Sequence, residues 1–301
     1  MIKISKKLII PVILLICLIT PVLVFLSRQP VLIVTEQSFL TIYGIQRSRM
    51  ESLYTSLLLF RQVKIVPVAD DVSDDILHYA VADASSNPFC VLFPLRFARG
   101  ARLYREHNQD VPVVLLEGRF AEGTNPSFFG IGSATDDYFI YKTDISGDFF
   151  HAGLVAAAID GEKNGRFVVF VEPGIQSSIR DAFLDGLGPE KSQKVSFFTS
   201  FSQFYEIPDI SCVIIAGIGH DYMEKYTGNP VIYFTWINPM YLPADVFMIF
   251  NDSPWAQAID AVKMVSLQER KGVIGSKRVL IKGSNLDKNV RSLLKNIGEN
   301  Q

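Results

Sequence analysis

The stretch from Tyr141 to Leu187 limits the possible folds of this 301-residue chain more than any other part of it. A helix rich in small residues is expected over 147–159, and after a polar turn the apolar run Phe167–Glu172 follows without alternation. Such a run is typical of a strand that is buried on both faces. Pro173 and Gly174 end this strand, and an amphipathic helix comes next. This order predicts a strand–helix–strand–helix unit of a parallel sheet, in which ligands bind beyond the carboxyl ends of the strands.

The same alternation of strands and helices continues on both sides of this stretch. The strands recur at intervals of about 25–30 residues, which suits parallel strands joined by right-handed helical crossovers. Strands are expected at 31–35, 63–69, 90–95 and 111–117 before the stretch, and at 195–200, 212–218, 230–236, 246–250 and 277–281 after it. Helices are expected at 43–60, 73–84, 96–107, 254–268 and 286–297.

The segment 118–137 is rich in Gly, Ser, Asn and Asp, and we interpret it as a crossing between two lobes that carries one edge strand at 128–133. A chain of this length can form two lobes with separate cores. The predicted fold class is α/β, with two doubly wound parallel-sheet lobes after an N-terminal segment. The first lobe is expected over 31–138, completed by 253–275, and the second over 139–252, completed by 276–301.

The N-terminal 30 residues have the composition of a membrane segment. Lys3, Lys6 and Lys7 precede the uncharged apolar run Leu8–Leu26. As a helix this run would reach roughly 28 Å, about the thickness of one hydrocarbon core. The lysines favour the cytoplasmic side, which places the rest of the chain outside the membrane.

An uncleaved anchor is the preferred interpretation of this segment, and two alternatives stay open. A cleaved signal peptide is one, although no clear A-x-A-like site follows the run. A lipoprotein signal is the other, because Leu14-Leu15-Ile16-Cys17 resembles a lipobox in which Ile16 replaces the usual small residue. All three predict a body that faces the periplasm or the cell exterior.

Charge and cysteine content exclude several classes of partner. The formal net charge of −2 gives no reason to expect nucleic acid. Cys90 and Cys212 fall in or beside expected buried strands, so we interpret them as small core residues rather than as a disulfide. No cysteine or histidine spacing predicts a metal site, and no cofactor is expected.

Catalysis has little support in the sequence. The motifs G-x-S-x-G, H-E-x-x-H and G-x-x-x-x-G-K-[ST] are absent from it. Of the four histidines only His220, which follows Gly217-Ile218-Gly219, comes directly after an expected strand, and a loop histidine is the preferred interpretation. We therefore do not expect an enzyme.

An ordered set of short motifs runs through the centre of the chain. It consists of Asp144, then Ala152-Gly153-Leu154-Val155-Ala156-Ala157, then Phe167–Val171, then Phe183-Leu184-Asp185-Gly186. With Gln37-Ser38-Phe39 after the first strand, this set resembles the type I periplasmic solute-binding proteins, nearest to the basic-membrane-lipoprotein or purine-nucleoside-receptor family. The resemblance implies two α/β lobes that are joined by three crossings and hold a ligand between them.

Two departures from the family pattern leave the ligand open. Leu40 stands where the family has Asn after its polar-Ser-Phe run, and the strand that ends at Trp236 lacks the acidic residue of sugar- and nucleoside-binding relatives. A ribose needs paired hydrogen-bond partners, because a buried unpaired polar group costs about 1–3 kcal/mol. The expected ligand is a nucleoside-like or other ring-containing solute of unknown identity.

The residues that follow the strand ends are the candidate ligand contacts, since a cleft binds a small molecule through a few placed polar groups. Phe39 and Trp236 could sandwich a planar ring or pack as core and rim residues. Asp144 could contact a ligand, cap the next helix, or do both. The candidates are Glu36, Gln37, Ser38, Phe39, Asp70 and Glu117 in the first lobe, and Asp144, Glu172, His220, Trp236 and Asn251 in the second.

The leading hypothesis is an exported, membrane-tethered receptor that closes on a small solute and presents the closed shape to an ABC-type permease. A ligand-sensing or scaffold protein of the same fold, acting on a membrane partner, is the alternative. The core of a LacI-type regulator is less favoured, because an apolar run occupies the place of its N-terminal helix-turn-helix. The expected partners are a small solute, a permease or other membrane protein, and the membrane itself through residues 8–26.

Overall fold

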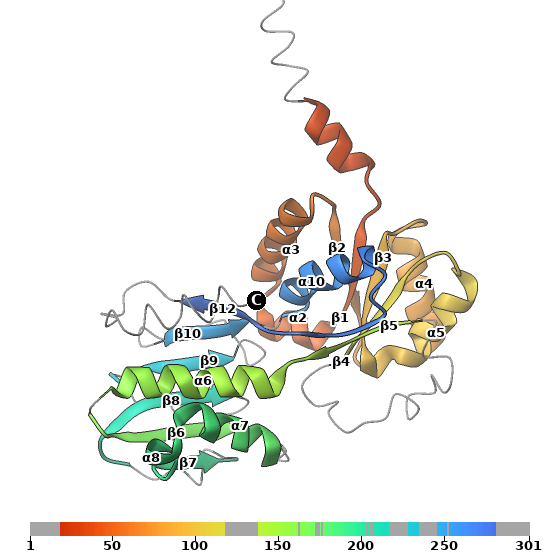
Figure 1. The fold of residues 1–301 in the computed structure, drawn as a ribbon. Coiled ribbons are helices and arrows are strands. Elements are labelled where there is room, and N and C mark those ends of the chain that lie inside the picture. The colour runs from red at the N-terminus through yellow and green to blue at the C-terminus, as the bar shows by residue number, and fades with distance from the viewer. Residues whose placement is uncertain are drawn as a thin grey trace, which may run out of the picture.

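The computed structural model describes residues 19–117, 138–161, 163–171, 175, 177–200, 202, 204, 207–216, 228–234, 246–251 and 253–280. These residues form two α/β units, each built on a six-stranded sheet (Figure 1). The strand order is β11-β5-β4-β3-β1-β2 in the first sheet and β12-β10-β9-β8-β6-β7 in the second. All the pairings are parallel except that of β12 with β10, so the predicted α/β class with parallel sheets is confirmed.

The strands are short, and those inside each sheet are almost completely buried, whereas the edge strands are partly exposed. Those of the first sheet are β1 (Val31–Glu36), β2 (Val63–Val68), β3 (Cys90–Pro94), β4 (Val113–Glu117), β5 (Phe139–Thr143) and β11 (Lys271–Ile274). Those of the second are β6 (Arg166–Val171), β7 (Val195–Phe198), β8 (Ile210–Ala216), β9 (Val231–Phe234), β10 (Val246–Asn251) and β12 (Lys277–Leu280). Cys90 and Cys212 are buried in β3 and β8 as free thiols, as expected.

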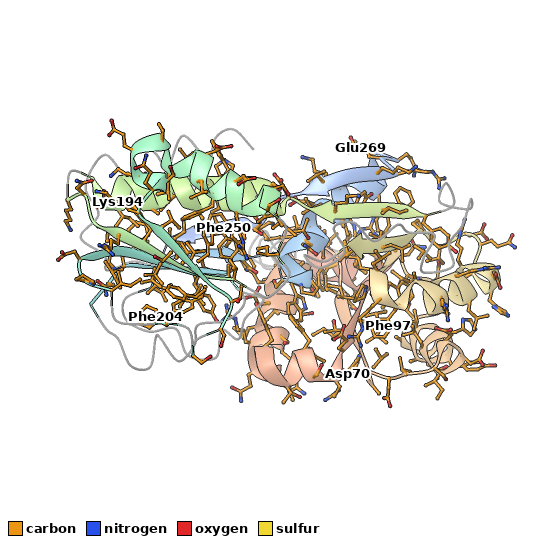
Figure 2. All side chains as sticks on the ribbon, turned by 90° about the horizontal axis from the view of Figure 1, so that it is seen from below. Asp70, Phe97, Lys194, Phe204, Phe250 and Glu269 are labelled. Carbon is orange, nitrogen blue, oxygen red and sulfur yellow. The ribbon has the colours of Figure 1, made fainter. Side chains whose placement is uncertain are left out.

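Helices cover both faces of the first sheet. The short helix η1 (Leu95–Phe97), α4 (Asp74–Ala84) and α5 (Ala98–His107) pack on one face, and α2 (Gln37–Tyr43) and α10 (Pro254–Ser266) pack on the other, with α3 (Ile45–Leu59) beside α10. In the second unit α6 (Ile145–Asp160) and α7 (Ser177–Leu187) cover one face, and α8 (Pro189–Ser192) follows α7. Figure 2 shows the side chains filling both units, with Phe97 in the first and Phe250 and Phe204 in the second. The continuous apolar strands are explained by this burial on both faces.

The first sheet differs from the expectation at two strands. Residues 139–143 were expected in the second lobe, but β5 lies between β4 and β11 and so belongs to the first sheet. The strand β11 was not predicted, because Lys271–Ile274 is short and half-polar and was joined to the preceding helix. It pairs with β5 and completes the sheet. The expected edge strand 128–133 and the closing helix 286–297 lie outside the described residues.

The expected helix 43–60 corresponds to α3, and the shorter helix α2 that precedes it was not predicted. Gly44 separates α2 from α3 with φ = 94°, a left-handed conformation that favours glycine. The break changes the direction of the chain directly after β1. As a result α3 lies along β2, with its first turn near the carboxyl end of β1.

Two glycines of the central motifs bring α6 and α7 into backbone contact. A Cβ at Gly153 would overlap the carbonyl oxygen of Phe183, and one at Gly186 would overlap the carbonyl oxygen of Phe150. The small residues of α6 were expected to let the sheet approach. Gly153 instead lets α7 approach, so the spacing of the two motifs is explained by one helix–helix contact.

We predict that Gly153→Ala destabilises the protein by about 1–3 kcal/mol or more, because the obstruction is backbone and cannot rotate away. Urea unfolding followed by circular dichroism would measure the change. Gly272→Ala is the matched control, since its Cβ would meet only the flexible end of Met264, and we expect it to stay within about 1 kcal/mol of the wild type. Equal effects of both substitutions would contradict the backbone contact.

Two serines of α3 form hydrogen bonds with the backbone at the open edge of the first sheet. Gln62 accepts a hydrogen bond from Val31 in β1, so the backbone groups of the next residue, Val63, point to the free side of β2. The hydroxyl of Ser52 donates to the Val63 carbonyl at 2.7 Å, and the hydroxyl of Ser56 accepts from the Val63 amide at 2.8 Å. Unpaired edge groups invite pairing with another chain, and these two side chains occupy them.

Replacing Ser56 by Ala should lower the free energy of unfolding by about 1–3 kcal/mol, because the buried amide of Val63 loses its acceptor. Thermal or chemical denaturation would show the loss. Ser266→Ala offers the comparison: its hydroxyl bonds only the Val262 carbonyl within α10, and its removal should cost clearly less. If Ser56→Ala were as mild, the serine would not be completing the edge.

A separate helix precedes β1. Residues 19–27 are helical and lead away from the first unit, as Figure 1 shows, and most of their apolar side chains are exposed. Phe25 contacts Phe60 edge-on, with ring centroids 5.8 Å apart, and Arg28 lies over the same ring. Within the described residues, no helix is both long and apolar enough to cross a membrane.

Candidate functional site

The carboxyl edges of the two sheets meet at three chain crossings. β5 leads into α6, β10 leads into α10, and β11 leads into β12, and each of the three departs from the carboxyl end of a parallel strand. Because β5 and β11 are parallel to the rest of the first sheet, and β10 to β9, both carboxyl edges are directed toward these crossings. Parallel α/β sheets bind ligands beyond this edge.

Buried polar contacts tie the crossings together. Asp148 of α6 is almost fully buried and accepts hydrogen bonds from the hydroxyl and the amide of Ser276, which lies between β11 and β12. Arg278 donates to Nδ1 of His151 at 2.8 Å, and burial together with the Arg278 charge holds the pKa of His151 below its usual value. In the first unit, the amide of Gln257 donates to the hydroxyl of Thr143 at 2.9 Å.

A polar corner lies at the carboxyl edge of the first sheet. Glu36 at the end of β1 pairs with Arg96 at 2.9 Å, and Arg96 also donates to the backbone carbonyl of Asp70 at 2.8 Å. The Asp70 carboxylate accepts from the backbone amide of Ser38 at 3.2 Å. We call Glu36, Ser38, Asp70 and Arg96 the polar corner. It places carboxylate acceptors and a guanidinium donor together at this edge of the sheet.

The Glu36 carboxylate has an unusual environment. Burial raises its pKa above the usual value, Arg96 opposes the shift, and the charge of Asp70 adds to it. The side chain is only 21% exposed although its partner Arg96 is 43% exposed. A carboxylate whose charged form is disfavoured by burial is a candidate functional group.

An aromatic cluster lies beside the polar corner. Phe39 stacks on Tyr43 with centroids 5.3 Å apart, and Trp255 of α10 packs against both rings. Phe39 therefore has the packed position that was one of its two expected roles. The indole nitrogen of Trp255 and the hydroxyl of Thr35 are buried and have no hydrogen-bond partner among the described residues.

The remaining candidates divide into three groups. Asp144 is the N-cap of α6 and accepts from the Gly147 amide at 3.0 Å, and Asn251 accepts from the Ser253 amide at 3.1 Å in the second crossing. Gln37 is exposed in the first turn of α2, and Glu117 ends β4 in register with Lys142. Glu172, His220 and Trp236 lie outside the described residues.

Several residues at this edge were not predicted. Arg96 follows the end of β3, so it met the criterion used for the other candidates, but it was assigned to the following helix. Asp148, His151 and Arg278 carry no local signal, because their partners are more than 120 residues away along the chain. Trp255 could have been recognised as a large aromatic residue in the first turn of the helix that returns to the first unit.

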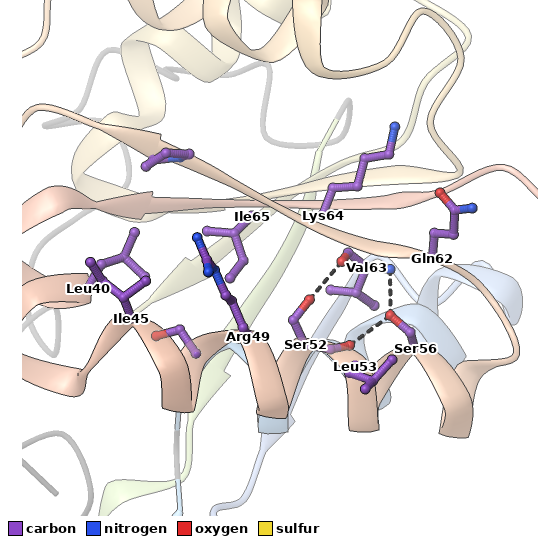
Figure 3. A pocket seen from close by; sticks show the side chains of 12 residues that line it. Leu40, Ile45, Arg49, Ser52, Leu53, Ser56, Gln62, Val63, Lys64 and Ile65 are labelled. Atoms are coloured by element: carbon purple, nitrogen blue, oxygen red, sulfur yellow. Dashed lines mark hydrogen bonds between the residues drawn. The ribbon is translucent and has the colours of Figure 1, made fainter. Parts of the chain in front are cut away.

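A concavity lies away from the crossings. It measures about 520 Å³ and runs between α3 and β2, where Ser52 and Ser56 point toward Val63 (Figure 3). Its hydroxyls already serve the edge of the sheet, as described above. It is therefore a less suitable solute site than the region between the carboxyl edges.

Comparison with known proteins identifies the fold. The structure resembles an ABC transporter solute-binding protein from Conexibacter woesei DSM 14684, with TM-score 0.60, 10% identity, and 91% of this chain and 95% of that chain covered. It also resembles a transcriptional activator of the comK gene from Bacillus halodurans (TM-score 0.55, 11% identity, 89% and 95% covered). A sugar-binding protein of a sugar ABC transporter from Bacillus halodurans gives TM-score 0.51 at 12% identity, with 86% and 99% covered.

These likenesses show that the chain has the periplasmic-binding-protein type I fold. No protein-family model matches the sequence, and no curated protein matches it either. The fold-level part of the expected resemblance is thus confirmed, whereas no comparison supports the nucleoside-receptor family in particular.

We predict that Glu36→Gln does not destabilise the protein at pH 7 and raises its stability slightly, by less than about 1 kcal/mol. Because the pKa of Glu36 is raised in the folded state, its charged form carries a cost above that pKa. The cost vanishes as the pH falls through the raised pKa toward 4.5, where both states become protonated. Melting temperatures of wild type and variant should therefore converge as the pH falls.

Glu106→Gln provides the control for this pH profile. Glu106 pairs with Arg102 at the same 2.9 Å distance, but both side chains are more than half exposed. Its substitution should give no gain at pH 7. A marked destabilisation by Glu36→Gln at pH 7 would contradict the proposed cost of burial.

Proposed function

We propose that the chain is an exported, membrane-tethered solute-binding protein, which closes its two units on a small molecule and delivers it to an ABC-type membrane transporter. The observation that carries this proposal is the meeting of both carboxyl edges at three crossings. Such a connection lets two rigid units change their angle by small rotations at the crossings. A solute that contacts both edges would then favour the closed arrangement.

The similar structures support a transport role. Those from Conexibacter woesei and Bacillus halodurans, at TM-scores of 0.60 and 0.51, are named as ABC transporter solute-binding and sugar-binding proteins. Binding and release by closure need no reacting group, and we place the chain with binding proteins rather than enzymes.

The solute that we propose is small, uncharged or cationic, and contains a ring. The polar corner holds two carboxylates and one guanidinium, which disfavours an anion and suits hydroxyl or amino groups. The buried indole N–H of Trp255 and the hydroxyl of Thr35 are additional groups that a solute or water could satisfy. Phe39 and Tyr43 provide aromatic surface nearby. Sugars and nucleosides have this combination of ring and hydroxyl groups.

The tether that we propose is the apolar run 8–26. Its described part, residues 19–27, is a helix with exposed Ile19, Val22, Leu23 and Leu26, a surface more suited to lipid than to water. The lysines before it place the body in the periplasm or at the cell exterior. A lipid anchor at Cys17 would give the same location.

A ligand-sensing role is the second candidate. The comK-gene activator from Bacillus halodurans has the same fold at TM-score 0.55, so this architecture also occurs in a regulator. A sensor would bind a solute and act on a membrane partner without transport. Uptake of the bound solute in cells that lack the gene would separate the two roles.

Thermal-shift measurements on the full chain in detergent, against a panel of sugars, nucleosides and amino acids, test the proposal. A solute at 100 times its dissociation constant should stabilise the protein by about 2.7 kcal/mol. Arg96→Ala should weaken that solute at least about tenfold, because a hydrogen bond to a charged group contributes about 1.5–3 kcal/mol.

Arg102→Ala, on the exposed side of α5, is the control and should leave the affinity unchanged. If no compound stabilised the protein and mass spectrometry found no co-purified solute, a scaffold role would replace the receptor role. If Arg96→Ala and Arg102→Ala behaved alike, the polar corner would not be part of the site.

A further inference from the structure

The helix α3 buries small polar side chains and exposes large apolar ones. Its buried residues are Ser48, Ser52, Thr55 and Ser56, whereas a surface helix normally buries an apolar face. The side chains that it exposes are mostly apolar, and six of them have between 51% and 66% of their surface accessible. These six are Ile45, Met50, Leu53, Tyr54, Leu57 and Leu58.

These exposed side chains form a regular stripe. Met50, Leu53, Leu57 and Phe60 follow the spacing of three, four and three residues that places side chains along the seam of paired helices. Tyr54 and Leu58 widen the same stripe. We call this stripe the outer face of α3; Ile45 lines the concavity between α3 and β2 and is not part of it.

The outer face is large for a monomer. Twelve of the 17 exposed large apolar side chains in the described part of the chain lie between residues 19 and 60, so they are concentrated in one region. From the exposed fractions, the outer face of α3 presents on the order of 700 Å², whereas a specific interface buries about 800 Å² per partner and most monomers expose smaller patches.

We propose that the outer face of α3 binds the same face of a second copy of this chain, with the two α3 helices parallel. A two-fold axis along the stripe makes the surface self-complementary, as a cyclic dimer requires. The pairing of the two faces does not depend on solute binding. The parallel orientation rests on the membrane tether proposed above.

The parallel orientation follows from the place where the N-terminal segment joins the first unit. The C-terminal end of α3 lies beside the start of β1, where Phe25 contacts Phe60 and Val31 donates to Gln62. Parallel α3 helices therefore place both N-terminal segments at the same end of the dimer, so that both can enter one membrane. Antiparallel helices would separate the two segments by at least the length of α3, about 22 Å at 1.5 Å per residue.

The same geometry disfavours lipid as the occupant of the outer face. One end of α3 lies where the N-terminal segment joins the first unit, and the other lies near the carboxyl edge of the sheet. In a body tethered through that segment, the axis of α3 would therefore point away from the membrane plane. A helix that binds a membrane surface lies in its plane. Charge is also compatible with self-pairing, because in a parallel pair Arg49 of one copy would face the ring of Tyr54 in the other.

The full chain in lipid nanodiscs or mild detergent tests this proposal. Multi-angle light scattering should give the mass of a dimer, and the double variant Leu53→Glu/Leu57→Glu should give half that mass with an unchanged circular dichroism spectrum, since both residues are exposed. Ile76→Glu/Tyr79→Glu on α4 is the matched control, with two equally exposed apolar residues, and should stay dimeric. A monomeric wild type, or a dimeric Leu53→Glu/Leu57→Glu variant, would overturn the proposal.

Cysteine cross-linking in a Cys17→Ser background tests the orientation and the alternative occupants. Met50→Cys and Leu57→Cys should both cross-link between copies, which an antiparallel pair would not allow, and Ile76→Cys should not. Brominated-lipid quenching of a fluorophore at Leu57→Cys without cross-linking would identify lipid as the occupant and refute the pairing. So would a variant ending at residue 280 that dimerises while the full chain does not, because the tail would then be the occupant.

Discussion

The arrangement of the two units depends on one buried carboxylate. Asp148 lies in the first turns of α6, in the second unit, and binds Ser276 at the point where the chain leaves β11 for β12. Without partners, a buried carboxylate would be expensive, so this contact holds two separate crossings at a fixed distance. Arg278 and His151 add a second tie one helical turn away. In the closure proposed above, the two units would rotate around these contacts.

Two further contacts explain sequence features that composition alone leaves obscure. Gly153 and Gly186, the glycines in the two central motifs, are needed for the same contact, because each lets the backbone of the other helix approach. The serines of α3 serve the backbone of Val63 at the sheet edge and are not ordinary surface residues. In both cases a polar or small residue occupies a position where a larger apolar one would be the usual choice. The consequence for α3 is that its apolar residues lie outside.

Local pattern was sufficient to predict most strands and helices, because continuous apolar runs and capping residues such as Ser73, Asp144 and Ser253 act within a few positions. It was insufficient where the partner is distant. β11 is recognisable only through its pairing with β5, and the outward apolar face of α3 only through its contact with β2. At the candidate site, Glu36, Ser38 and Asp70 were found because strand ends in a parallel sheet converge. Arg96 was missed because it lies in the short helix that directly follows β3 and was therefore assigned to a helix. Asp148 was missed because its partner, Ser276, lies 128 positions away along the chain.

The route of the chain through the sheets also has a consequence for biogenesis. The described elements from α6 to β10 belong to the second unit alone, so most of that unit can collapse as soon as they have been made. The first sheet lacks its edge partner for β5 until Lys271–Ile274 has been made, and the second lacks its edge partner for β10 until Lys277–Leu280 has been made. Closing so long a loop is slow, and the amino-terminal portion stays incomplete while the ribosome adds more than a hundred residues. A delay of this kind would keep the polypeptide unfolded long enough to be threaded through a channel, as the export proposed above requires.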